Sequence, residues 1–330
     1  MAPNAKAALI ALVGFAAFAT HDVLVKTLGA QFSSVQIVFF NVLFAFPLVT
    51  LTLIRDPAAG TLRPAHPWWV ALRTGAAVIT ALCAFYAFST IQLAQVYAIL
   101  FASPLLITLL AIPILGEPVR LRRWAAVIVG LTGVMIVLQP GSTTLTLGHG
   151  AALIAAIGSA FASVISRRIG RDERSVVLVL YPMLANFAIM GALLPQVHVA
   201  MPLESLALNA LLSALGFAGA MLMVLAYKTG EAVVVAPMQY SQILWATVFG
   251  ALFFDEFPDT PTLVGAGIVI ASGLYIVLRE SGSTASRLRP VLRSRTRVFT
   301  GALPRLSPPD KGPRFHRRRE AGDPLSKPHG

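Results

Sequence analysis

The stretch Ala7-Ala8-Leu9-Ile10-Ala11 occurs a second time, 144 positions later, as Ala151-Ala152-Leu153-Ile154-Ala155. Gly14 follows the first copy and Gly158 follows the second at the same spacing. Each copy opens a long apolar segment. We therefore predict that the chain is a tandem duplication of one structural unit.

A second pair of landmarks supports the duplication. Gly116-Glu117-Pro118 ends an apolar segment in the first half, and Asp255-Glu256-Phe257-Pro258 ends another one 139 residues later. Duplicated membrane units are the usual architecture of secondary transporters.

The composition favours a membrane protein. Of the 330 residues, 56% are hydrophobic and only 12% are charged, and the mean hydropathy is +0.76. Soluble domains carry roughly 25% charged residues, so lipid is the solvent that suits this chain. The single cysteine, Cys83, excludes an internal disulfide.

Segments of about 20 apolar residues are long enough to cross a bilayer as helices. Ten such segments occur, at residues 7–28, 34–54, 68–90, 94–115, 122–139, 149–167, 176–196, 205–227, 231–254 and 261–278. We predict an all-α integral membrane fold of ten transmembrane helices in two repeats, 7–139 (helices 1–5) and 149–280 (helices 6–10).

Basic residues gather in alternate connections, and the positive-inside rule places those connections in the cytoplasm. They are Arg55, Arg63, Arg120, Arg122, Arg123, Arg167, Arg168, Arg171, Arg174 and Lys228. Both termini are then cytoplasmic. Because five helices per repeat is an odd number, the two halves must be inverted relative to one another.

Most of the net charge of +12 belongs to the C-terminal tail. From Arg279 onward there are 13 Lys and Arg against 4 Asp and Glu. We expect the tail, 281–330, to be a basic, disordered cytoplasmic segment. It either contacts anionic membrane lipid or only enforces the orientation, and we expect no nucleic acid as a partner.

Motifs in both halves resemble the EamA domain of the drug/metabolite transporter superfamily. They include Arg73-Thr-Gly-Ala, Gln92-Leu-Ala-Gln-Val-Tyr97, Ser103-Pro104, Leu115-Gly116-Glu117, Ala236-Pro237-Met-Gln239-Tyr240 and Gly265-Ala-Gly267. The resemblance covers residues 7–280. It implies two inverted five-helix repeats around a central cavity and secondary transport of small metabolites across the inner (cytoplasmic) membrane. The chain departs from the family in helix 2, where Phe40-Asn41-Val42 stands in place of a frequent arginine.

Ionisable residues within a membrane span are costly and are therefore functional candidates. His21, Asp22 and Lys26 lie in one apolar segment. Asp22 and Lys26 are four residues apart and can pair on one helix face. His21 and Asp22 either bind a substrate or a proton in the cavity, or belong to a structural ion pair with Lys26 near the outer interface.

Polar and aromatic residues in other spans complete the predicted substrate site, because solute sites are mostly apolar with a few oriented polar groups. They are Asn41, Tyr86, Tyr97, Tyr181, Gln239, Tyr240 and Trp245. Interhelical hydrogen bonding is the alternative role for each of them. The density of such residues after Pro237, where Gln242 lies between Tyr240 and Trp245, favours the binding role there.

Enzyme motifs are missing: the chain has no P-loop, no HExxH and no GxSxG. We expect no enzymatic activity, no cofactor and no metal, and a monomer or homodimer that moves a small-molecule solute by alternating access. Two other classes stay open, an integral-membrane enzyme acting on lipid carriers and a membrane scaffold that works through its basic tail.

Overall fold

A computed structural model describes residues 3–54, 62–116, 119, 121–140, 144–170 and 172–282, with side chains described at all of these except 52–54 and 277–282. The predicted tail beyond residue 282 lies outside this part of the chain, as does Glu117.

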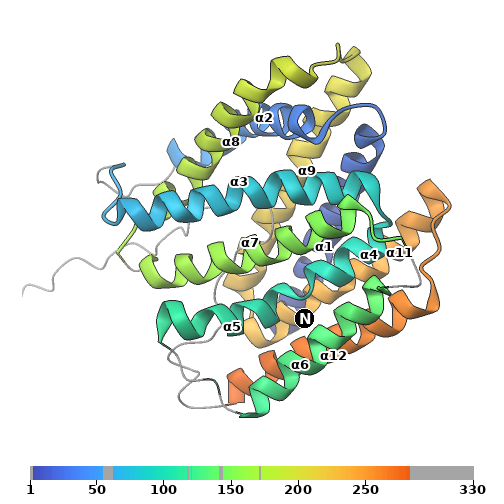
Figure 1. Cartoon of the computed structure of the whole chain (residues 1–330). Coiled ribbons are helices and arrows are strands. Elements are labelled where there is room, and N and C mark those ends of the chain that lie inside the picture. The colour runs from blue at the N-terminus through green and yellow to red at the C-terminus, as the bar shows by residue number, and fades with distance from the viewer. Residues whose placement is uncertain are drawn as a thin grey trace, which may run out of the picture.

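Within the described residues the protein is entirely helical (Figure 1). The elements are α1 (Pro3–Gly29), α2 (Ser34–Ile54), α3 (Pro67–Thr90), α4 (Leu93–Leu100), α5 (Ser103–Leu115), α6 (Leu121–Leu138), α7 (Leu147–Ile169), α8 (Ser175–Val197), α9 (Leu203–Thr229), α10 (Ala232–Val235), the 3-10 helix η1 (Ala236–Tyr240), α11 (Ser241–Phe254) and α12 (Thr260–Gly282).

The number of membrane-crossing segments agrees with the prediction. Nine segments of the described chain are long and apolar enough to span a bilayer, and the tenth is the shorter apolar stretch Thr260–Ile276. The all-helical membrane fold with ten crossing segments is therefore confirmed.

The fourth and ninth segments are each interrupted, where the sequence predicted one unbroken helix. The segment 94–115 divides into α4 and α5, and 231–254 divides into α10, η1 and α11. Pro104 stands in the first turn of α5 and Pro237 in η1. Proline has no N–H to donate, and its ring clashes with the carbonyl four residues earlier, so an α-helix cannot pass through unchanged.

The two halves of the chain pack against each other through equivalent pairs of helices. The first helix of each half packs along the third spanning helix of the other: α1 along α9, and α7 along α3 (Figure 1). The last helices of the halves, α6 and α12, pack on each other, and so do the second helices, α2 and α8. This reciprocal pattern is consistent with two inverted repeats related by a pseudo-two-fold axis.

The repeated glycines lie at equivalent helix crossings. A Cβ at Gly14 would lie 3.3 Å from the carbonyl oxygen of Gly219, where α1 crosses α9. A Cβ at Gly158 would meet the Thr80 hydroxyl and lie 3.4 Å from the Ala76 carbonyl oxygen, where α7 crosses α3. The absence of a side chain at these positions permits the close approach of the helices.

The start of α12 is fixed by Asp259, which lies outside the membrane spans. Its carboxylate accepts a hydrogen bond from the Thr262 N–H at 3.1 Å and from Gln139 Nε2 at 2.5 Å. Burial alone would raise the pKa of Asp259, but the hydrogen bonds from Thr262 and Gln139 together lower it below its ordinary value of 3.8. The charged carboxylate therefore stabilises this helix start.

Candidate functional site

A buried polar network between the two halves contains two of the predicted site residues on α1. His21 and Asp22 are 0% and 1% exposed, and His21 Nδ1 lies 2.8 Å from Asp22 Oδ1. The Tyr97 hydroxyl on α4 donates to Asp22 Oδ2. Gln242 Nε2 on α11 donates to Tyr97 Oη at 3.1 Å. We call these four residues the Asp22 network, and it joins the first half of the chain to the second.

The direction of these hydrogen bonds follows from their chemistry. An amide NH₂ group can only donate, so the Tyr97 oxygen accepts from Gln242 and its own proton is left for the Asp22 carboxylate. Tyr97 thereby connects Gln242, from the second half of the chain, to the Asp22 carboxylate on α1. A buried acid needs such partners, because an uncompensated charge in the bundle is costly.

Aromatic rings enclose the Asp22 network. The Phe85 ring packs edge-on against His21 at a centroid distance of 5.8 Å, and the Phe88 ring lies 5.4 Å from that of Tyr97. Phe101 bridges the two halves, with its ring 6.0 Å from Tyr97 and 5.1 Å from Tyr240. An acid within rings of this kind is suited to an organic cation, since π faces attract positive charge.

The Asp22 network lies beside both helix interruptions. Tyr97 is in α4, and Phe101 follows directly after the last residue of α4. Tyr240 ends η1 and Gln242 is in the first turn of α11. In many transporters the solute site lies near the membrane midplane, where discontinuous helices of the two repeats meet. In this protein, too, the polar network lies where the interrupted helices of the two halves meet.

A second contact between the halves lies at the end of α1. Lys26 Nζ is 2.6 Å from Glu256 Oε1, donates to the Ile91 carbonyl at 2.6 Å and lies 5.4 Å from the centre of the Phe254 ring. Glu256 Oε2 also accepts from the Leu93 N–H at 3.3 Å, in the first turn of α4. We call this group of residues the Lys26 junction.

The Lys26 junction corrects one expectation from the sequence. The pairing of Lys26 with Asp22 is wrong, since Lys26 binds Glu256 instead and Asp22 binds His21 and Tyr97. The partner of Lys26 comes from the other half of the chain, which helical spacing along α1 does not reveal.

The remaining predicted residues are spread over the bundle. Asn41 on α2 is buried, and its carbonyl accepts a hydrogen bond from Ser213 on α9 at 2.8 Å. Tyr86 on α3 is half-buried against the main core. Gln239 is half-buried in η1 next to Tyr240.

Two further predicted residues also lie outside the contacts of the Asp22 network. Half-buried Trp245 on α11 packs against Phe249, with a centroid distance of 5.6 Å. The Tyr181 hydroxyl on α8 donates to the Leu62 carbonyl at 3.5 Å, in the connection before α3. Of the predicted residues, His21, Asp22 and Tyr97 are therefore in direct contact, and the Phe101 ring connects Tyr97 to Tyr240. Tyr181 lies apart from them, near the connection before α3.

Phe85, Phe101 and Glu256 take part in these contacts but were not among the predicted substrate-binding residues. Gln242 was singled out in the sequence together with its polar neighbours after Pro237, and it lies in the Asp22 network. The phenylalanines had no such signal, because Phe occurs in eight of the ten predicted spans and therefore does not single out a site.

The EamA-like transporter family matches the chain over residues 5–139 and 146–278. A crystal structure with 18% sequence identity has the same fold, with a TM-score of 0.56, covering 84% of this chain and 99% of that chain. The family match makes the protein a secondary transporter of small metabolites, not an enzyme. The chain belongs to the EamA-like transporter family, within the drug/metabolite transporter superfamily.

Relatives with assigned substrates align along most of their length. An S-adenosylmethionine uptake transporter of Rickettsia bellii is 25% identical over 84% of this chain and 95% of its own length. A riboflavin transporter of Rhizobium johnstonii is 27% identical over 77% and 84%. A pseudopaline exporter of Pseudomonas aeruginosa is 24% identical over 83% and 96%. The family membership fixes neither substrate nor direction, because these relatives include both an uptake transporter and an exporter.

Proposed function

We propose that the Asp22 network is the solute site, and that it binds a metabolite carrying both a cationic group and a flat ring. The observation that carries the proposal is the position of Asp22: a fully buried acid, enclosed by aromatic rings, where α1 and α4 of one half meet α11 of the other. The carboxylate would pair with the cation, and Phe85, Phe101 and Tyr240 would contact the ring.

S-adenosylmethionine is the first substrate to test. It combines a sulfonium cation, an ammonium group and a purine ring, and the relative from Rickettsia bellii takes it up. Riboflavin is the second, because the relative from Rhizobium johnstonii transports it and its flat ring suits the aromatic wall. Riboflavin has no cation for Asp22, which makes the two solutes distinguishable.

Alternating access requires the site to open to each side of the membrane in turn. The side chains of His21 and Asp22 are closed off in this conformation. The Lys26 junction ties α1 and the start of α4 to the end of α11. We propose that it is the latch on the outer side, and that Lys26 and Glu256 part when the site opens outward.

The proposal places the protein in the inner membrane of a bacterial cell with both termini in the cytoplasm, as the distribution of basic residues predicts. Asn41, Tyr86, Tyr181, Gln239 and Trp245 stay predicted wall residues of the open cavity. A monomer or homodimer, and contact of the tail with membrane lipid, also stay predictions.

Proton coupling is the second candidate role for the same residues. Imidazole and carboxylate groups can both carry a proton, and His21 Nδ1 lies 2.8 Å from Asp22 Oδ1. The coupling would make uptake depend on a pH gradient, whereas exchange or facilitated diffusion would not.

The test is uptake of labelled S-adenosylmethionine and riboflavin into proteoliposomes, with and without a pH gradient. We expect S-adenosylmethionine to accumulate, and Asp22→Asn to reduce its uptake at least tenfold. Asp172→Asn is the matched control, because Asp172 is a 65% exposed acid. Uptake of riboflavin alone, or full activity of Asp22→Asn, would contradict the assigned solute class.

A further inference from the structure

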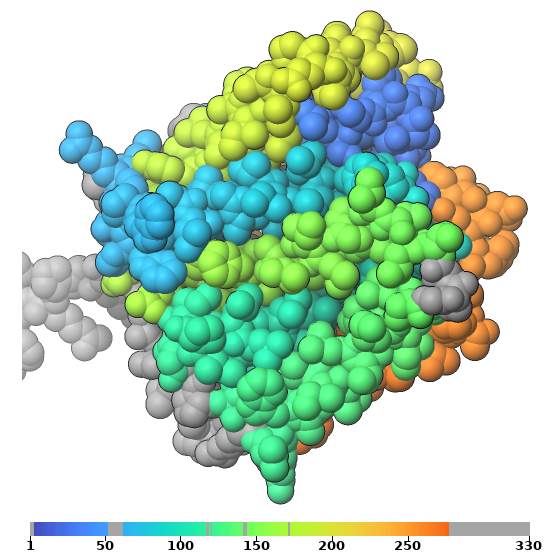
Figure 2. Space-filling view, viewed as in Figure 1, coloured from blue at the N-terminus to red at the C-terminus, as the bar shows by residue number. Residues whose placement is uncertain are grey.

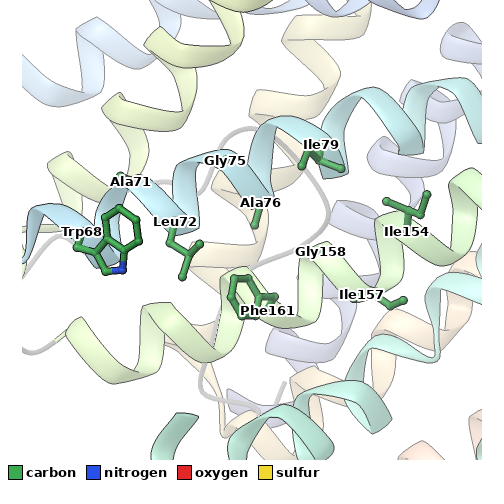
Figure 3. Close-up of a pocket in the computed structure, with 10 residues that line it drawn as sticks. All are labelled: Trp68, Ala71, Leu72, Gly75, Ala76, Ile79, Ile154, Ile157, Gly158 and Phe161. Carbon is green, nitrogen blue, oxygen red and sulfur yellow. The ribbon is translucent and has the colours of Figure 1, made fainter. Parts of the chain in front are cut away.

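A long apolar groove runs along the outside of the bundle between α3 and α7. It has a volume of about 550 Å³ and is lined by Trp68, Ala71, Leu72, Gly75, Ala76, Ile79, Ile154, Ile157, Gly158 and Phe161 (Figure 3). Figure 2 shows the face of the molecule on which α3 and α7 lie next to one another at the surface. Every lining side chain is apolar.

The groove opens away from the proposed solute site. Trp68 is 74% exposed and Ile157 is 49% exposed, whereas the residues of the Asp22 network are buried. In a membrane-spanning bundle, an outward apolar surface of this kind faces the hydrocarbon of the bilayer. The groove is therefore open to lipid chains.

The length of the groove corresponds to one leaflet. Along α3 it runs from Trp68, in the first turn, to Ile79, in the middle of the helix. At 1.5 Å per residue that distance is about 16 Å. It is roughly half of the 30 Å hydrocarbon core, so the groove reaches from one membrane interface to about the midplane.

The interfacial end of the groove is cationic. The Arg168 guanidinium, exposed in the last turn of α7, stacks 4.6 Å from the centre of the Trp69 ring and also donates to the Ile114 carbonyl. Tryptophan and arginine are the side chains that anchor a protein at the headgroup level.

Arginines outnumber the acids at the same end of the bundle. The positive charges there are those of Arg63, Arg167, Arg168 and Arg174, against the negative charges of Asp172 and Glu173. Both acids contact His66: Asp172 lies 3.5 Å from its ring nitrogen, and Glu173 accepts from its backbone N–H at 2.5 Å. The end of the groove is thus suited to an anionic headgroup.

We propose that the groove is a specific binding site for an anionic phospholipid, with one acyl chain between α3 and α7 and the phosphate beside Arg168. An anionic phospholipid fits the groove in three respects: its acyl chain suits the apolar lining, the groove is as long as one leaflet, and the headgroup would lie at the cationic interfacial end. A second copy of the chain would account for the apolar lining alone. The site is independent of the proposed solute and of the Asp22 network.

Gly75 allows the groove to be filled without disturbing the bundle. A Cβ added at Gly75 has no atom within 4 Å, and the same is true of Gly267, which faces outward on α12. Gly75→Leu therefore occupies the groove, and Gly267→Leu is the matched control. Arg168→Gln removes the charge at the headgroup position, and Lys228→Gln is its control at the exposed end of α9.

The experiment is native mass spectrometry of the full-length protein, released from nanodiscs containing equal parts of phosphatidylglycerol and phosphatidylcholine. We expect one retained phosphatidylglycerol per protein. Gly75→Leu should weaken its retention at least tenfold, and Arg168→Gln should abolish the preference over phosphatidylcholine. Both control variants should behave like the unsubstituted protein.

Three results would overturn the proposal. They are equal retention of the two lipids by the unsubstituted protein, unchanged retention by Gly75→Leu, and loss of a dimer rather than of a lipid in Gly75→Leu. The last would assign the groove to a contact between copies of this chain.

Discussion

Replacing Glu256 by glutamine should release the outer latch. The substitution keeps the shape of the side chain and an oxygen that can accept from the Leu93 N–H. It removes the negative charge 2.6 Å from Lys26 Nζ. The closed conformation then loses an ion pair that links the two halves, while the conformation open to the outside loses nothing.

The size of the effect follows from the burial of the pair. The Lys26 and Glu256 side chains are 11% and 20% exposed. Exposed pairs contribute about 0–1 kcal/mol, and removing one partner of a fully buried pair costs about 3–5 kcal/mol. A value of about 2 kcal/mol lies between these limits, and it corresponds to a shift of roughly 30-fold in the equilibrium between closed and open states.

The assay is the alkylation rate of a reporter cysteine by a membrane-impermeant maleimide in right-side-out vesicles. Ala94→Cys is a suitable reporter in a Cys83→Ser background, because Ala94 is 4% exposed in the first turn of α4. We expect alkylation about 30-fold faster with Glu256→Gln. The control is Asp255→Asn, which removes an exposed charge one residue away.

A double-mutant cycle with Lys26→Met isolates the ion pair. If Lys26 and Glu256 form the latch, the second substitution adds little to the first, and the coupling free energy is about 2 kcal/mol. An alkylation rate that stays unchanged in Glu256→Gln, or additive effects in the cycle, would refute the latch.

Three further substitutions test other parts of the structure. Tyr97→Phe removes the O–H that donates to Asp22, so uptake in proteoliposomes should fall at least tenfold, since a hydrogen bond to a charged group contributes about 1.5–3 kcal/mol. Gly273→Ala places a Cβ against the Tyr240 hydroxyl, and it should lower stability in thermal unfolding by about 1–3 kcal/mol. Asp259→Ala should lower stability by about 1 kcal/mol at neutral pH, and the difference should vanish on acidification, because a lowered pKa stabilises the fold only until the pH falls through the folded-state pKa.

Each of the three has a control and a contradicting result. Tyr275→Phe removes a hydroxyl from a lipid-facing tyrosine on α12 and should leave uptake unchanged. Gly267→Ala meets no atom within 4 Å and should leave stability unchanged. Normal uptake by Tyr97→Phe, a neutral Gly273→Ala, or an Asp259→Ala deficit that persists below the folded-state pKa would count against the corresponding contact.

The sequence predicted the spans well, because the need for about 20 apolar residues per crossing is a strong local constraint. It predicted the broken helices less well. Pro104 and Pro237 were visible, but a proline in a membrane helix can give a kink or a full interruption, depending on which groups satisfy the freed carbonyl. Here the chain tightens before Pro104, with the Ala102 N–H donating to the Ile99 carbonyl at 3.0 Å.

The candidate site was predicted in part. His21 and Asp22 were found because a histidine and an acid in an apolar span carry a large desolvation cost and so need a reason to be there. Tyr97, which donates to Asp22 from another helix, is 75 residues away in the chain, and no periodicity along α1 specifies it. The same limit explains why Lys26 was paired with the acid one helical turn away rather than with Glu256.

By itself, the sequence determined that the protein lies in a lipid bilayer, that it crosses the bilayer ten times and that its two halves are duplicates. Composition and repetition can be found along the chain without knowing how it folds. Only the tertiary structure decided which polar residues meet. The inverted packing of the halves places α11 against α1 and α4, so Gln242 reaches Tyr97 and Glu256 reaches Lys26 across the boundary between the repeats. Contacts between distant segments depend on how the helices pack, and that packing is decided by the shapes of whole helix faces rather than by any local pattern.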